Sequence, residues 1–171
     1  MTPRSRGFVI AVVHAALVLV VAGWFLYERD TLPRVWVLTA GVDPLLPIRG
    51  RYADLRLVID LHGSPAALEE ARKLKHGWTV PHAEGGQLSG DLLPHGESAN
   101  GQSVTYDARG ERWLLWQPAA FFLSEHEPDP TILAGGEELW AEVSLPARGP
   151  PRPIRLEVRR AGAAGAEMPA P

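Results

Sequence analysis

One long apolar stretch near the start of the chain, residues 7–27 (GFVIAVVHAALVLVVAGWFLY), constrains this protein more than any other feature. The hydrocarbon core of a bilayer requires about 20 apolar residues in a helix, and this stretch reaches that length without a charged residue. His14 is its only strongly polar residue. Trp24, Phe25 and Tyr27 lie at its distal end, where aromatic rings favour the headgroup layer. The stretch therefore predicts a transmembrane helix that holds the rest of the chain at a membrane.

The charges on the two sides of this stretch are balanced. Arg4 and Arg6 precede it, while Arg29 and Arg34 follow it closely. Basic residues close to a span set its orientation, so this balance leaves the orientation open. A cleaved signal peptide is the main alternative to an anchor, but its apolar region would be unusually long and no small-residue cleavage site follows it. We favour an anchor, with the following domain outside the cytoplasm.

The chain is thus expected to contain four segments. Residues 1–6 form a cytoplasmic N-terminus, residues 7–27 the transmembrane anchor, residues 28–160 an extracytoplasmic β-rich domain and residues 161–171 a disordered tail. The tail (AGAAGAEMPAP) has too few hydrophobic side chains to pack. The residues after the span suffice for one domain. We therefore expect a single-pass protein of the cytoplasmic (inner) membrane.

The composition excludes several classes of function. The formal net charge is −3 and the chain has no basic patch, so we expect no nucleic-acid partner. The chain has no cysteine, which excludes disulfides, thiolate metal sites and cysteine nucleophiles. Its 17 glycines and 16 prolines are typical of short elements joined by many turns. We also expect no cofactor.

Nearly strict alternation of apolar and polar side chains marks two segments. The first is residues 52–61, where one face carries Ala53, Leu55, Leu57, Ile59 and Leu61. The second is residues 137–145, where one face carries Leu139, Ala141, Val143 and Leu145. A period of two predicts half-buried strands.

Other segments complete the expected fold. Residues 64–76 predict a helix that Ser64 caps and Gly77 ends. Further strands are expected at residues 35–40, 102–108, 111–117, 119–123 and 154–159, whereas residues 78–101 are expected to be loop with short strand pieces. Together these segments predict a mostly β fold: a small antiparallel β-sandwich or barrel-like domain, with one short helix over an open end or an edge.

Residues 42–57 (VDPLLPIRGRYADLRL) resemble the motif of the GDYXXLXY family of membrane-anchored bacterial proteins, whose function is uncharacterised. The matching positions are Asp43, Pro44, Arg49, Gly50, Tyr52 and Leu55. Arg51 stands where the family has an aspartate, and Leu57 where it has a tyrosine. Residues 121–125 (FFLSE) and 139–143 (LWAEV) are similar to two later strands of that family, the first ending in Glu125. The resemblance implies an anchored protein of the bacterial envelope.

The chemistry of the motif residues is mainly structural. Asp43 and Pro44 favour a turn, because an aspartate bonds backbone amides and a proline restricts φ. Gly50 permits a positive φ or a close backbone approach. Arg49 is suited to bond carbonyls or to pair with a carboxylate such as Asp54 or Glu125. The favoured interpretation is a turn that determines the fold, and the alternative is a binding surface.

Two aromatic residues are the other candidates for an interaction surface. Tyr52 is expected to lay its ring on the core with its hydroxyl at the rim. Trp140 alternates in phase with the polar side of its strand, opposite Leu139 and Ala141. Cross-strand packing is the favoured role for the tryptophans, and an exposed aromatic patch for a protein or glycan partner is the alternative.

No catalytic or metal-binding pattern is recognisable. The histidines after the span are His62, His76, His82, His95 and His126, and their spacings match no known metal motif. Ser64 lacks the Gly-x-Ser-x-Gly frame of a hydrolase and suits a helix cap better.

We therefore expect a non-enzymatic accessory or interaction module that partners another membrane or envelope protein. An envelope hydrolase acting on peptide or cell-wall material is the alternative. A ligand-sensing domain that signals through the span is a third and weaker possibility.

Overall fold

The computed structural model describes residues 3–43, 52–94, 101–124, 126 and 130–162. The chain divides into two compact units, residues 1–32 and 33–171. The expected tail at residues 161–171 lies outside the described residues beyond residue 162.

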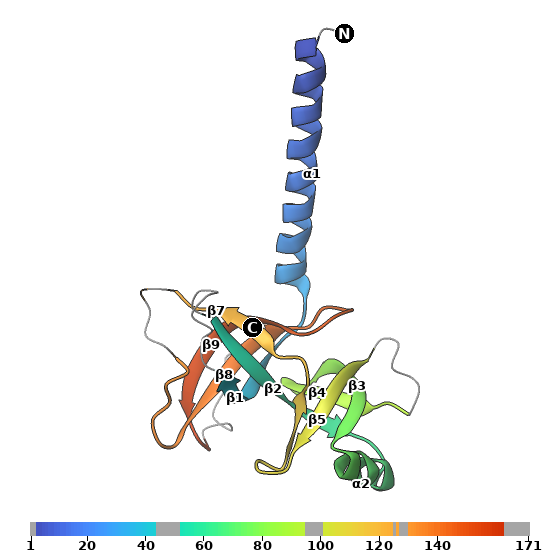
Figure 1. Ribbon diagram of the computed structural model, residues 1–171, viewed down its shortest axis with the longest axis vertical. Coiled ribbons are helices and arrows are strands. Elements are labelled where there is room, and N and C mark those ends of the chain that lie inside the picture. The colour runs from blue at the N-terminus through green and yellow to red at the C-terminus, as the bar shows by residue number, and fades with distance from the viewer. Residues whose placement is uncertain (1–2, 44–51, 95–100, 125, 127–129, 163–171) are drawn as a thin grey trace. The chain divides into compact units, whose positions relative to one another are not determined.

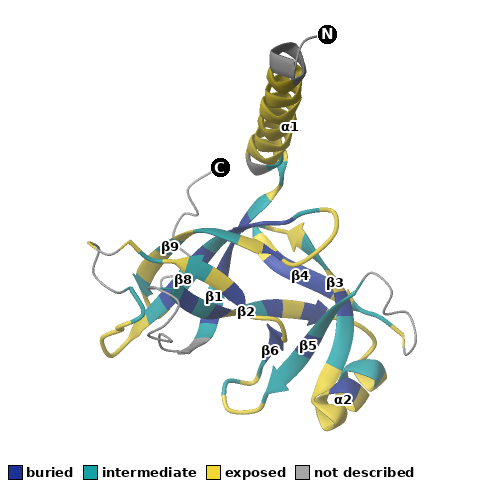
Figure 2. Ribbon diagram, turned by 45° about the horizontal axis from the view of Figure 1, so that its top comes forward, coloured by how far each residue is buried: buried dark blue, intermediate teal, exposed yellow. Residues whose placement is uncertain are grey.

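The first unit is helix α1 (Pro3–Thr31), and Figure 2 shows it exposed along its length. Within it, Gly7–Glu28 has a mean hydropathy of 2.6 and no buried residue in its most apolar window. The His14 ring nitrogen Nδ1 lies 2.9 Å from the Ile10 carbonyl oxygen one turn earlier, so the imidazole has a partner within the helix. The helix is long and apolar enough to cross a membrane, and a signal sequence would meet the same criterion.

The second unit is mostly β, as predicted (Figure 1). Its elements in chain order are β1 (Arg34–Asp43), β2 (Tyr52–His62), α2 (Pro65–Leu74), β3 (His76–Glu84), β4 (Gln87–Leu92), β5 (Gln102–Asp107), β6 (Arg112–Leu115), β7 (Ala119–Phe122), β8 (Glu137–Ser144) and β9 (Arg152–Arg160).

Five strands close into a small barrel in the order β2–β4–β3–β5–β6, with β6 returning to β2. Closure depends on the second half of β2, where Ile59 pairs with Trp113 of β6 and Asp60 pairs with Ser89 of β4. The β2–β4 pair is parallel, whereas the other barrel pairs are antiparallel. The expectation of a barrel-like domain is confirmed.

The first half of β2 belongs to a second group of strands, in the order β7–β2–β1–β8–β9. Tyr52 pairs with Phe122 of β7, and Val42 of β1 pairs with Leu55. The earlier part of β1 pairs with β8, where Val37 lies opposite Ala141. Strand β2 therefore belongs to both groups and joins the barrel to the β1–β8–β9 sheet.

The two alternating segments have the predicted buried faces. In β2 the five predicted side chains are 6% exposed or less, and Leu55 and Leu57 are fully buried. Leu139, Ala141, Val143 and Leu145 are also buried. These side chains contribute to one hydrophobic core, which extends into the barrel through Val104 and Leu115.

Helix α2 lies at the end of the barrel where β2 ends and β3 begins (Figure 1). Ser64 caps it as predicted, its side-chain oxygen accepting a hydrogen bond from the Ala67 backbone N–H at 3.3 Å. The prediction that Gly77 ends the helix is wrong, because Lys75 adopts the left-handed conformation there with φ 54°. Gly77 lies within β3, where a Cβ atom would stand 2.8 Å from the Leu92 side chain.

The prediction of loop with short strand pieces over residues 78–101 is largely wrong. β3 and β4 form a hairpin whose turn contains Gly85 and Gly86, both with positive φ. Gly90 lies in the barrel wall, where the Thr79 side chain leaves no room for a Cβ atom. The glycines thus mark a tight turn and close packing between strands.

Candidate interaction surface

The structure separates the described motif residues into a core position and a surface position. Leu55 is fully buried, so it serves the fold. Tyr52 instead lies on the opposite face of β2, with its ring centroid 6.5 Å from that of Phe122. The expectation that the Tyr52 ring lies on the core is therefore wrong. The backbone of Asp43 pairs with Asp54, while the Asp43 side chain and the predicted residues Pro44, Arg49, Gly50 and Glu125 lie outside the described residues.

Trp140 is half-buried on the outward side of β8, in the phase that the alternation predicted. Its indole Nε1–H donates a hydrogen bond to the Glu138 carboxylate at 3.3 Å. The Arg159 guanidinium lies 5.2 Å from its ring centroid, within the range of a cation–π interaction. Trp140 is thus oriented by neighbours on both β8 and β9.

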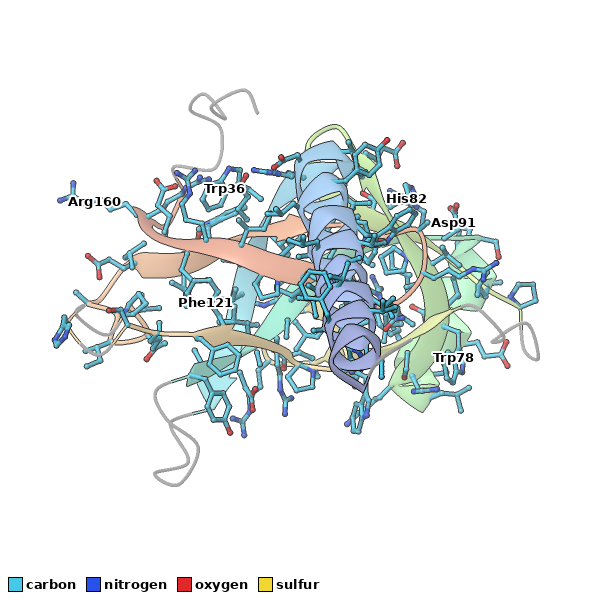
Figure 3. All side chains as sticks on the ribbon, turned by 90° about the horizontal axis from the view of Figure 1, so that it is seen from above. Trp36, Trp78, His82, Asp91, Phe121 and Arg160 are labelled. Carbon is cyan, nitrogen blue, oxygen red and sulfur yellow. The ribbon has the colours of Figure 1, made fainter. Side chains whose placement is uncertain are left out.

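Trp36 of β1 extends this arrangement across the sheet. Its ring lies beneath two guanidinium groups, with Arg159 4.4 Å and Arg155 5.0 Å from the ring centroid. These contacts help leave Trp36 only 6% exposed. Figure 3 shows Trp36 on the β9 side of the second unit. We call Trp36, Trp140, Arg155 and Arg159 the Trp–Arg face.

Carboxylates balance the positive charge of this face. The Glu142 carboxylate lies 3.5 Å from Arg155 and 3.9 Å from Arg34, and its side chain is only 14% exposed. A second ion pair joins Arg159 to Glu157 at 3.0 Å. These contacts hold the guanidinium groups in position over the indoles, which orders the surface before any partner binds.

A groove of about 200 Å³ adjoins the Trp–Arg face. It extends from β1 and β8 to the outer side of the barrel, and its lining residues are Trp36, Val37, Leu38, Val58, Asp60, Gln87, Leu88 and Trp140. Most of this lining is apolar, with one carboxylate and one amide. Such a groove suits an apolar side chain of a partner whose polar neighbours bond to the rim.

The residues of this surface come from strands that are distant in the sequence. The sequence indicated Trp140 through its alternation phase, whereas Trp36 was not singled out. The available signal was the charged face of the last strand, where Arg155, Glu157 and Arg159 stand at alternate positions. The sequence does not show that these guanidinium groups cover two indoles.

Two histidines of the barrel, His62 and His82, form a separate exposed cluster with carboxylates. Glu84 lies 3.6 Å from His82 and 3.8 Å from His62, and His62 lies 3.8 Å from Asp60. Among the described residues no group of three or more histidine or acidic side chains is arranged to hold a metal ion.

The comparisons with known proteins give no family for this chain. The sequence matches no protein-family model. It matches no curated protein and no solved structure. The resemblance to the GDYXXLXY family therefore stays a prediction that rests on residues 42–57.

Proposed function

We propose that this is a single-pass protein of the cytoplasmic membrane whose β-rich domain lies on the extracytoplasmic side. There it binds another membrane or envelope protein as an accessory subunit. Helix α1 supports the anchor, because Gly7–Glu28 matches the thickness of a bilayer core and has a mean hydropathy of 2.6. The resemblance of residues 42–57 to an anchored envelope family supports the orientation.

The observation that carries the binding role is the Trp–Arg face with its groove. Tryptophan and arginine are the residues most enriched where binding energy concentrates in protein interfaces. Here two indoles and two guanidinium groups are already held by mutual contacts, so a partner would order few side chains on binding. The adjoining groove accommodates an apolar side chain beside Trp140.

The rival interpretation is an envelope hydrolase, and Ser64 is the serine that was considered for it. Its hydroxyl oxygen accepts a hydrogen bond from the Ala67 N–H at the start of α2, which is the role of a helix cap. No specific contact favours a hydrolytic role for this residue. The interaction role is therefore the one proposed.

Capture from native membranes tests the proposal. Tagged full-length protein is cross-linked and purified beside a Trp140→Ala variant and a Phe122→Ala variant, which removes an exposed aromatic side chain from a different strand. We expect one dominant membrane or envelope protein with the native chain and with Phe122→Ala. Trp140→Ala should reduce its recovery strongly, because a central aromatic contributes about 2 kcal/mol or more. Equal recovery with Trp140→Ala, or hydrolysis of cell-wall peptide by the purified protein, would contradict the proposal.

A further inference from the structure

A second aromatic feature lies on three adjacent strands of the barrel. Trp78 of β3 pairs with Ser103 of β5. Trp116, just after β6, donates its backbone N–H to the Ser103 carbonyl oxygen at 2.9 Å. Residues directly opposite one another on antiparallel strands project to the same face. Trp78, Ser103 and Trp116 therefore form one row, with the small hydroxyl side chain between two indoles.

This row lies on the outside of the barrel. The neighbouring row of Gly77, Val104 and Leu115 points inward, because Val104 and Leu115 are almost fully buried. Alternation then turns the adjacent row outward, and Trp116 is 65% exposed. Figure 3 shows Trp78 and Trp36 on opposite sides of the second unit, so this row is distinct from the Trp–Arg face.

The spacing of the row makes the two indoles separate stacking surfaces. Adjacent strands lie about 4.8 Å apart, so the strand positions of the two indoles are about 10 Å apart. A single ring in van der Waals contact with both indoles would require about 7 Å between them, since carbon atoms in contact are about 3.5 Å apart. Gly101 packs beside Trp78, where a Cβ atom would stand 2.9 Å from the Leu93 side chain and 3.6 Å from the indole.

Polar groups of Ser103 and His76 lie beside the two indoles. The Ser103 hydroxyl oxygen lies 3.4 Å from the His76 ring nitrogen Nδ1, and the His76 and Trp78 rings meet edge to face at 5.8 Å. A hydroxyl and an imidazole can each donate or accept a hydrogen bond. A groove of about 200 Å³ continues from Trp78 towards α2, and Glu70 is its acidic lining residue.

These features exclude other classes of ligand. Both edges of β3 and of β5 are paired within the barrel, so a peptide cannot bind here by adding a strand. Among the described residues that line the row and the groove there is no lysine or arginine, so a phosphate, a nucleic acid or an anionic lipid would lack a counter-charge. Aromatic faces with hydroxyl-bonding groups between them suit a neutral ring that has apolar faces and hydroxyl edges.

We infer that this row is a carbohydrate-binding site. Pyranose rings of a neutral oligosaccharide stack on Trp78 and on Trp116, and hydroxyl groups of the sugar bond to Ser103 and His76. The inference does not depend on the Trp–Arg face or on the proposed protein partner.

Fluorine NMR of full-length protein in lipid nanodiscs, labelled with fluorotryptophan, tests the inference. The probes are chitotriose in its N-acetylated form, cellotriose and maltotriose, each at millimolar concentration. The signals of Trp78 and Trp116 are assigned from their Trp→Phe variants. We expect at least one probe to shift both signals saturably, while the signals of Trp36 and Trp140 stay in place.

Two variants decide whether the row is responsible. Trp116→Ala removes an exposed side chain and should leave the fold intact while it weakens binding about tenfold. Phe122→Ala, also an exposed aromatic change, should leave binding unchanged. The absence of a shift with all three probes would overturn the inference. So would binding that Trp116→Ala leaves unaltered, or shifts confined to Trp36 and Trp140.

Discussion

At the scale of single residues, the interior of the domain leaves little freedom for substitution. Leu55 and Leu57 have no exposed surface, and each points from β2 into a core to which both groups of strands contribute. Packing in such a core is close to that of an organic crystal, so the loss of even a few atoms is costly.

Truncation of one core leucine should therefore destabilise the domain strongly. Leu55→Ala should lower the free energy of unfolding by about 2–5 kcal/mol, through lost burial and the cavity that remains. The exposed neighbour Arg56 provides the control. Arg56→Ala should change the free energy of unfolding by less than about 0.5 kcal/mol. Denaturant unfolding of both variants gives the two values, and similar values would contradict the assigned faces of β2.

A methyl group added at Gly90, in the barrel wall, should also destabilise the domain. A Cβ atom at Gly90 would overlap the Thr79 hydroxyl and stand 3.2 Å from Ile59 Cδ1. Thr79 has no exposed surface and donates to the Asp91 carbonyl oxygen at 2.8 Å, so it cannot move aside cheaply. Gly90→Ala should cost about 1–3 kcal/mol by thermal or denaturant unfolding. Gly135→Ala, at a position with open space, should be nearly neutral, and equal losses would refute this packing.

At the scale of elements, strands β1, β8 and β9 are joined on their outer side by the Trp–Arg face. Arg159 contacts the rings of both Trp36 and Trp140, so one side chain of β9 reaches across β8 to β1. β9 itself has few buried side chains. The contacts of Arg159 are therefore important for holding this edge strand.

Exchange of this arginine for lysine should weaken the sheet although the charge is retained. A guanidinium plane stacks on indoles, whereas an ammonium group is compact and strongly hydrated. Arg159→Lys should lower the free energy of unfolding by about 1 kcal/mol. Arg160→Lys, one position further and exposed, is the matched control and should have almost no effect. A loss of the same size in both variants would show that the stacking contributes nothing.

The local sequence pattern predicted where the strands lie and which faces are buried. It did not predict which strands pair with one another. The faces of β2 and β8 follow from a period of two, since that pattern directly records which side chains are buried. The predicted loop over residues 78–101 is wrong because glycine favours both turns and close contacts between strands. Gly90 makes such a close contact between strands. Closure of the barrel by β2 and β4, and the meeting of Trp36 with Arg159, depend on contacts between distant segments that no local pattern records.

At the scale of the whole molecule, the proposal requires that α1 crosses a membrane and that the β-rich domain lies outside the cytoplasm. Both requirements can be tested directly because the chain has no cysteine. A single introduced cysteine is then the only thiol of this chain, so labelling of the purified protein reports on that position alone.

The variant Ala147→Cys places that thiol at an exposed position between β8 and β9. In intact spheroplasts we expect a membrane-impermeant maleimide to label it fully, and prior lysis should add nothing. The variant Ser5→Cys, before the apolar stretch, should be labelled only after lysis. The reverse pattern would place the domain in the cytoplasm, and release of the protein from washed membranes would indicate a cleaved signal.

Site-specific photo-cross-linking in living cells is the most direct test of whether the groove beside Trp140 binds a protein partner. A photoreactive amino acid replaces Gln87, which lines the groove, or Gln117, an exposed glutamine that does not line it. With the photoreactive residue at position 87, we expect one discrete cross-linked membrane or envelope protein. With that residue at position 117, we expect none. Its yield should fall when Trp140→Ala is added. No adduct from position 87, or the same adducts from both positions, would contradict the claim that this surface is where the protein acts.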